Sequence, residues 1–274
     1  DRIIQYSKSK RYYSKNPKGK TLKQVLSPRT YSTLKRKFKQ DATQTLREGL
    51  KEVIKEADKD VDVDEIIENE ARELANRSFE FFATMRPWMA ASVLEQMEIH
   101  NRYPEDCVDE LIRKIAKEHG KPFAGLETAE GQLAPLTTLS PEEEDALLYT
   151  MCRRMIDDKR EGLDVGGEML AVYLRGDVED IEAYIARERV LDGKYMSVEL
   201  HDKIMKGMLD TRNDQMVKSI LAQLTAKPAS VGFFAVGAAH MVGEVGLVTA
   251  LRRAGYTVTR VKAAPKSVAA RGPQ

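Results

Sequence analysis

A histidine stands where an apolar run meets a glycine-containing turn, in the stretch FFAVGAAHMVGEVG that contains His240. A neutral imidazole has an unperturbed pKa close to neutrality, so it can accept a proton in hydrolysis or ligate a metal ion. Gly237 lets the chain turn sharply before it, and Gly243 can cap a following helix whose free backbone N–H groups suit an anion or a developing oxyanion. The competing interpretation is a core histidine that is bonded to a backbone carbonyl.

A carboxylate ends a second apolar stretch, because Glu127 closes the run KPFAGLE. Burial raises the pKa of a carboxyl group unless a cation or metal ion pairs with it, which is the behaviour of an acid/base residue or a ligand. An exposed, helix-capping acid fits the sequence equally well. The remaining candidates are polar residues near these two positions: Arg212, which could clamp a carboxylate or pair with Glu127, Asn213, a poor helix former within a helical stretch, and Glu244.

Other chemical motifs are absent from the sequence. There is no H-E-x-x-H, G-x-S-x-G, P-loop or G-x-G-x-x-G pattern, and His100, His119 and His201 lack ligand spacing and have helix-end or helix-surface contexts. Cys107 and Cys152 have no C-x-x-C spacing and are interpreted as buried or idle thiols. The chemistry is therefore expected around His240 and Glu127.

Most of the elements that must position these residues are predicted to be helices. Apolar spacing, caps and acidic first turns predict helices over several ranges: 27 to about 80, from 87, 104–120, 140–162, 166–176, 177–188, 198–224 and 243–254. Three short apolar segments, 121–128, 231–237 and 256–261, are predicted to be strands. The expected fold is α/β, with a small, mostly parallel sheet that is wrapped by many helices and carries Glu127 and His240 at its carboxyl edge.

The charge distribution is uneven, although the 274 residues carry a formal net charge of only +1. That balance gives no reason to expect nucleic acid or an anionic membrane as a partner. Residues 1–20 are expected to form a basic, flexible arm and residues 263–274 a disordered tail, on either side of one domain over 21–262. A helical protein that binds a partner through the basic arm remains an alternative.

Membrane insertion is not expected, because the apolar runs are far shorter than the roughly 20 residues that a spanning helix needs. The chain reads as soluble as given. It begins with Asp rather than Met, so an upstream address or anchor segment, for example for the cell envelope or periplasm, stays open. The sequence leaves the compartment and the oligomeric state open.

Several stretches, in this order, resemble the TraB/PrgY/GumN family, which is similar to the Tiki metalloproteases and, more distantly, to erythromycin esterases. They are GLETAEGQ, TRNDQM and FFAVGAAHMVGEVGLVTALRRAGYTVTRV, with support from LSPRTYSTLKRKF and MRPWMAASVL further upstream. The likeness covers roughly residues 20 to 262. Within it, residues 27 to about 119 are interpreted as a helical insert.

The resemblance implies an α/β fold whose polar site, built from two G-x-x-H motifs and glutamates, binds a divalent metal ion and hydrolyses an amide bond. On this chain the second G-x-x-H falls at His240, and the glutamate of the G-L-E-T motif falls at Glu127, so these two become candidate metal ligands. Arg212 and Asn213 match the R-N pair, and Glu244 matches the G-E-x-G turn.

The first G-x-x-H has no match, since no histidine precedes His100, and the acid-ended strand that usually follows it is missing as well. One histidine and one glutamate fall short of the three protein ligands that catalytic zinc typically keeps. We therefore expect a metal-dependent hydrolase, peptidase-like, with an incomplete site in this chain and a peptide or small molecule as substrate. The alternative is a non-catalytic module on the same fold that binds a peptide or other ligand.

Overall fold

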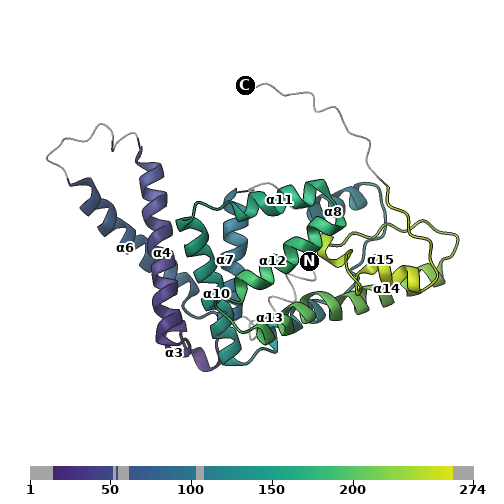
Figure 1. The fold of residues 1–274 in the computed structure, drawn as a ribbon, viewed down its shortest axis with the longest axis horizontal. Coiled ribbons are helices and arrows are strands. Elements are labelled where there is room, and N and C mark those ends of the chain that lie inside the picture. The colour runs from purple at the N-terminus through teal and green to yellow at the C-terminus, as the bar shows by residue number, and fades with distance from the viewer. Residues whose placement is uncertain (1–14, 52–53, 55–61, 103–107, 262–274) are drawn as a thin grey trace, which may run out of the picture.

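The structure is a computed structural model that describes residues 15–51, 54, 62–102 and 108–261. Figure 1 shows an elongated arrangement of helices, with α4 and α6 at one end and α14 and α15 at the other. The helices are α3 (Leu22–Val25), α4 (Pro28–Gly49), α6 (Val63–Phe82), α7 (Pro87–Arg102), α8 (Val108–Glu118), α9 (Ala129–Thr137), α10 (Pro141–Arg160), α11 (Val165–Arg175), α12 (Val178–Asp192), α13 (Val198–Met205), α14 (Arg212–Ala226) and α15 (Leu247–Arg253).

The main core lies where α4, α6, α7 and α10 pack together. Apolar residues at helical spacing bury one face of each helix, and Leu34, Phe82 and Leu148 are at most 1% exposed. Cys152 belongs to the same cluster, and burial raises the pKa of its thiol to about 12, as expected for an idle thiol. Cys107 lies outside the described residues. The helices predicted in this half of the chain are confirmed.

A carboxylate from α10 completes the start of α4. Ser27 caps α4 by accepting from the Thr30 N–H, and Pro28 occupies the first turn. Asp145 accepts from the backbone N–H and the Oγ of Ser27, at 2.9 and 2.8 Å, and from the Oγ1 of Thr30 at 2.8 Å. These bonds span up to 118 positions in the sequence, so the beginning of α4 is fixed by the tertiary fold.

The described part of the expected basic arm is attached to the core. Asn16 is 6% exposed, and its Nδ2 donates to the Met85 carbonyl at 2.6 Å. Lys15 and Met85 form an isolated β-bridge. Residues 1–14 and 262–274, with most of the expected arm and all of the expected tail, lie outside the described residues, and the domain boundaries stay a prediction.

The predicted sheet is wrong. Apart from the single bridge at Lys15, residues 15–51, 54, 62–102 and 108–261 contain no strand and are predominantly helical. The three predicted strands, 121–128, 231–237 and 256–261, contain no strand pairing, and much of their length is exposed, including Phe123, Phe233 and Val261. Their composition is typical of strands, but a strand exists only when a second extended backbone pairs with it. The described residues supply no such backbone.

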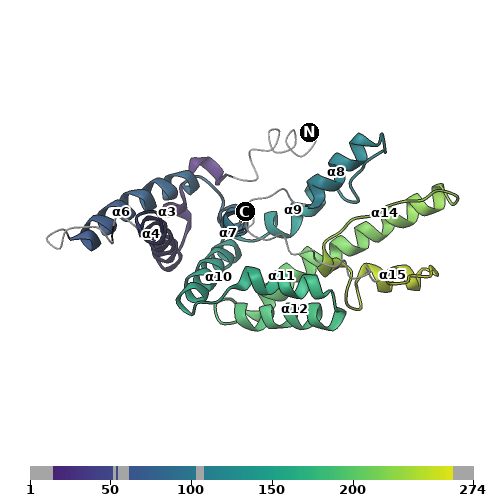
Figure 2. The same ribbon diagram turned by 90° about the horizontal axis from the view of Figure 1, so that it is seen from above.

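The long helix predicted over 198–224 is confirmed, because every residue from Val198 to Ala226 is helical. Within this helical stretch, a π-helical turn over Lys206–Thr211 joins α13 to α14. The helix predicted from Gly243 begins four positions later, since α15 is capped by Gly246 while Gly243 has a φ of 82° and forms the preceding turn. Viewed from above in Figure 2, α14 and α15 run side by side at this end of the molecule. In the described part of the chain, no helix is long and apolar enough to cross a membrane.

Candidate functional site

An amide side chain fixes the orientation of His240. The imidazole is 8% exposed, and its Nδ1 lies 2.7 Å from the Oδ1 of Asn213. Asn213 is 2% exposed, and its Nδ2 donates to the Val245 carbonyl at 2.9 Å. Because a carbonyl can only accept, this bond assigns the amide nitrogen to Val245 and the amide oxygen to the imidazole. Nδ1 of His240 therefore carries the proton and donates, which leaves the lone pair on Nε2.

The surroundings of His240 favour its neutral form. Burial lowers the pKa of the imidazole below its ordinary value, the positive charge of Arg212 lowers it further, and the negative charge of Glu127 opposes both. The same three side chains that the sequence singled out therefore act on one another. A neutral imidazole with a bare Nε2 can accept a proton or donate its lone pair to a cation.

Arg212 and Glu127 form a bidentate pair. The guanidinium donates from Nη2 to Oε1 at 2.6 Å and from Nε to Oε2 at 3.0 Å, and the two side chains are 13% and 15% exposed. Nη1 donates to the Met208 carbonyl at 3.3 Å. Both carboxylate oxygens of Glu127 are thus engaged by protein donors, which is the pairing that the sequence offered as one role for Arg212.

Helix α14 carries this arrangement. Arg212 and Asn213 open the helix, and consecutive residues of a helix point about 100° apart, so one reaches Glu127 and the other reaches His240. Further along α14, Ser219 donates to the Leu126 carbonyl at 2.6 Å and holds the segment that leads to Glu127.

The π-helical turn before α14 is packed tightly against α9. A Cβ placed on Gly207 would come within 2.8 Å of the Pro135 side chain, closer than real contacts allow. Glycine at this position therefore lets the turn approach α9, and the turn ends at the residue before Arg212. π-helical segments occur often at functional sites, because the extra residue changes which side chains face inward.

Glu244 is separate from this group. Its side chain is 89% exposed and pairs with Arg253 on α15, with 2.5 Å between Oε2 and Nη2. The backbone amides that were expected to face His240 belong to a turn, because α15 itself starts only at Leu247. The structure therefore brings together His240, Asn213, Arg212 and Glu127 and leaves Glu244 in solvent.

The residues around His240 supply only part of the ligand set that a divalent metal ion needs. No group of three or more His, Cys, Asp and Glu side chains suited to a metal ion occurs in the described ranges. Glu127 is engaged by Arg212 at both oxygens, so Nε2 of His240 is the one unengaged ligand atom of the expected pair. The described residues of this chain do not fit a three-ligand metal site.

Sequence reasoning missed two features. Ser219 carries no motif, and its contact with Leu126 could be found only by knowing that α14 passes beside the segment before Glu127. His201 was placed on a helix surface but is 5% exposed, and its Nδ1 lies 3.2 Å from the Oδ2 of Asp192. It is a buried histidine that is satisfied by a carboxylate.

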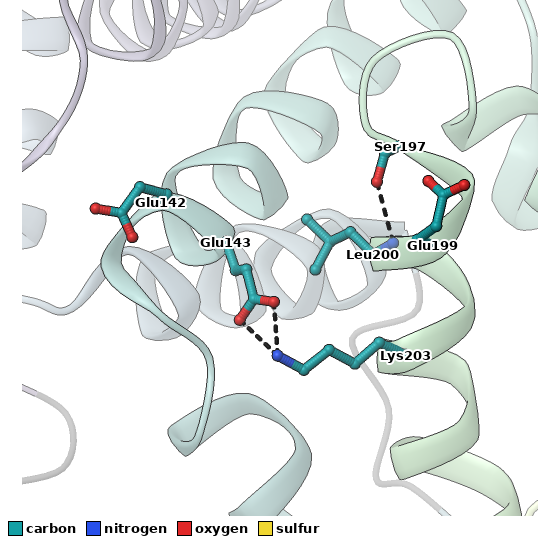
Figure 3. A pocket seen from close by; sticks show the side chains of 6 residues that line it. All are labelled: Glu142, Glu143, Ser197, Glu199, Leu200 and Lys203. Carbon is teal, nitrogen blue, oxygen red and sulfur yellow. Dashed lines mark hydrogen bonds and ion pairs between the residues drawn. The ribbon is translucent and has the colours of Figure 1, made fainter.

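Two surface hollows lie away from these residues. One joins the start of α10 to the start of α13, where Lys203 contacts both oxygens of Glu143 at 2.6 and 2.7 Å, and Figure 3 shows the side chains that line it: Glu142, Glu143, Ser197, Glu199, Leu200 and Lys203. The other runs along α4. Neither is lined by His240 or Glu127, so the candidate site rests on the side-chain geometry.

Comparison with known proteins agrees with the motifs around His240. The model of the TraB/PrgY/gumN family matches residues 5–260, nearly the whole chain. No curated protein and no solved structure matches the chain.

Proposed function

Because the chain belongs to the TraB/PrgY/gumN family, we propose that it contributes His240 to a hydrolytic, peptidase-like site, with Nε2 as the atom that accepts a proton. The observation that carries this proposal is the hydrogen-bonded series from Val245 through Asn213 to the imidazole. It holds the proton on Nδ1 and exposes the lone pair of Nε2. A lowered pKa keeps that lone pair available near pH 7.

The proposed step is proton transfer from an attacking water molecule to Nε2. When the imidazole becomes positively charged, its Nδ1–H continues to donate to Asn213, so the orientation of the ring survives the transfer. The proton on Nε2 is then in position to be returned to the leaving amine. Asn213 acts through the imidazole, and it is therefore a positioning residue.

Arg212 and Glu127 have a supporting role in this proposal. Their bidentate pair sets the electrostatic environment of the imidazole, since the cation disfavours and the carboxylate favours the charged ring. A substrate carboxylate or a developing oxyanion could compete with Glu127 for the guanidinium, whose fork matches either group. No step here is assigned to a metal ion.

Paired histidine variants test the role of His240. The change His240→Gln should lower the hydrolysis of a mixture of internally quenched peptides by at least about a hundredfold, the usual scale of general-base catalysis. Asn213→Ala should lower it by about tenfold or more, because the ring loses its orientation. The matched control is His201→Gln, which removes another buried histidine and should keep the activity.

The pH dependence separates a catalytic role from a structural one. In the wild type, kcat/KM should rise with pH through the lowered pKa of His240 and then level off, and this rise should be absent in the residual activity of His240→Gln. Full activity of His240→Gln in a chain with unchanged circular dichroism would refute the proposal. Elemental analysis of both proteins adds one readout: a tightly bound divalent ion lost with His240→Gln would make Nε2 a ligand instead of a base.

A second candidate function is a binding module without turnover. The observation in its favour is that Arg212 occupies both oxygens of Glu127, so the second acidic group of the expected site is not free to react. A peptide that binds tightly, without metal, and is recovered uncleaved after prolonged incubation would favour this candidate.

A further inference from the structure

The turn before α14 contains one residue more than an α-helical turn. Lys206–Thr211 is π-helical, and Arg212 and Asn213 follow it directly as the first residues of α14. A π-helical turn closes hydrogen bonds between residues i and i+5 instead of i and i+4, so it holds about one extra residue. Successive side chains of an α-helix point about 100° apart. The extra residue therefore decides which side chains of α14 face Glu127 and His240.

A regular α-helix in the same place would present different side chains. If the turn were α-helical while α13 stayed where it is, each residue of α14 would move one position further along the helix. Thr211 would then occupy the position of Arg212, opposite Glu127. Arg212 would occupy the position of Asn213, opposite His240, where a guanidinium cannot accept from Nδ1 because it can only donate. Both contacts of the site therefore require the π-helical turn.

Two contacts tie this turn to the stretch that begins at Glu127. At the end of the turn, Arg212 pairs with Glu127, with 2.6 Å between Nη2 and Oε1. Near its start, a Cβ on Gly207 would come within 2.8 Å of the Cβ and 3.1 Å of the Cγ of Pro135. Thr128 caps α9, which contains Pro135, so both contacts are made by one short stretch of chain. Two separate contacts fix the rotation of the turn about its axis, whereas either contact alone would leave that rotation free.

The turn also bonds to the arginine that follows it. The backbone N–H of Arg212 donates to the Leu209 carbonyl, and Nη1 donates to the Met208 carbonyl at 3.3 Å. Arg212 thus contacts the turn with its backbone and its side chain, while Nε and Nη2 hold Glu127. A change in the turn would therefore move the guanidinium directly.

The second contact joins two residues that a helix disfavours. Pro135 lies inside α9, although a proline there removes a backbone donor and crowds the preceding turn. Its ring stands against Gly207, and both residues are partly buried. Glycine and proline are the two residues that favour a helix least, so the local helices do not account for either residue. Their close approach does account for them.

We propose that Gly207 and Pro135 are positioning residues of the His240 site, an inference that rests on the proposed function for its effect on catalysis. Their contact keeps the turn π-helical, and the turn selects the two residues that open α14 as the partners of Glu127 and His240. The direct consequence is the place of the ring proton. The bond to Asn213 holds that proton on Nδ1, and the bond exists only in this register.

A methyl group on Gly207 tests the contact. Gly207→Ala places a Cβ where the Pro135 ring stands, so the turn must leave α9. Nitrogen NMR spectra of the imidazole show which ring nitrogen carries the proton. The wild type should show Nδ1–H, and the variant should show a mixture with Nε2–H, because Asn213 no longer accepts from the ring. The kcat/KM for peptide hydrolysis should fall by about tenfold or more. The matched control is Gly131→Ala in α9, whose Cβ would have an ordinary contact at 3.4 Å, and it should keep both values.

Two changes at Pro135 separate positioning from folding. When Pro135→Gly is added to Gly207→Ala, the nearest remaining atom of residue 135 is its Cα at 3.4 Å, so the Nδ1–H signal should return. Pro135→Ala alone removes the ring and favours the helix α9. It should therefore keep or raise the thermal midpoint while the Nδ1–H population falls. A merely structural contact would change stability and leave the ring proton in place.

The outcomes separate this inference from the proposed function. An Nδ1–H signal that is unchanged in both Gly207→Ala and Pro135→Ala would overturn the inference, whether or not the chain hydrolyses peptides. A signal that Gly207→Ala removes and Pro135→Gly does not restore would also overturn it. If the ring proton moves as expected but the wild type cleaves no peptide, the positioning residues stand and the hydrolase is rejected. A wild-type ring that carries its proton on Nε2 would contradict the bond from Asn213 and overturn both proposals.

Discussion

The two ends of this molecule differ in how far their apolar side chains are exposed to solvent. At the end formed by α4, α6, α7 and α10, Phe82 is 1% exposed within a continuous core. At the other end, Phe233 is 79% exposed on a segment that contacts only one layer of helices. Both phenylalanines lie in apolar surroundings in the sequence, so the difference arises from the backbone that carries them.

A helix satisfies its own backbone, whereas a strand depends on a neighbour. Each helix around Phe82 can form first and then bury its apolar face. Phe234 and Val236 pack against the apolar cluster of α14 and α15, but within the described residues no hydrogen bond engages the N–H and C=O groups of residues 231–236. The comparison therefore predicts that substitutions in the helical core change the free energy of unfolding strongly, and that substitutions of exposed residues in the segment 231–236 change it little.

The largest effect is expected for the matched pair of phenylalanines. Phe82→Ala should lower the free energy of unfolding by about 3–5 kcal/mol, because it removes a buried ring and leaves a cavity. Phe233→Ala should change it by less than about 0.5 kcal/mol, because that ring is already in solvent. Chemical denaturation of both variants measures the two values. Similar losses of unfolding free energy in the two variants would show that Phe233 is packed in solution, and the contrast between the two ends would disappear.

A smaller effect is expected for a matched pair of carboxylates. Glu144 is 3% exposed and accepts from Arg86, with 3.0 Å to Nε, and from the Trp88 N–H at 3.4 Å. Glu144→Gln leaves the guanidinium without its counter-charge and should cost about 3 kcal/mol of unfolding free energy. Glu244→Gln removes an exposed partner of Arg253 and should leave the denaturation curve unchanged. A measurable loss for Glu244→Gln would contradict its placement in solvent.

The smallest effect is expected for the pH dependence of the free energy of unfolding that His240 contributes. The folded pKa of His240 is lowered, so the unfolded chain takes up the proton first as the pH falls. Stability from this group is fully present above the unfolded pKa of about 6.5 and is lost as the pH falls through the folded pKa. The difference in unfolding free energy between wild type and His240→Gln should shrink over that window, by at most about 1.4 kcal/mol per pH unit. A constant difference would mean that the pKa is not lowered.

The helices were predictable, and the pairing of the predicted strands was not. The Ser27–Pro28 cap and the apolar spacing of α4 determine a helix locally, so the sequence alone suffices. Residues 231–237 have strand composition, but pairing is a property of two segments, and within the described residues no other segment pairs with this one. The π-helical turn between α13 and α14 was not predicted either, and it lies against Pro135, which is far from Gly207 in the sequence.

Much of the candidate site followed from residue types and family motifs. The Arg212–Glu127 pair was among the expectations, and the unusual position of Asn213 within a helix has its reason in the bond to His240. Glu244 could not be placed from its motif, since a turn residue can face either the site or solvent. Ser219 was missed because its partner is a backbone carbonyl, which no side-chain pattern announces.

The bonds from Asp145 to the start of α4 impose an order on biosynthesis. A chain leaves the ribosome from its N-terminus at about 5–20 residues per second, so Asp145 follows Ser27, 118 positions earlier, by roughly 6 to 24 s. During that interval α4 lacks the carboxylate that holds its first turn, and the core that α4, α6 and α7 share with α10 lacks the residues of α10. The nascent chain therefore passes through a stage in which the apolar residues that Leu148 and Cys152 later cover are still exposed.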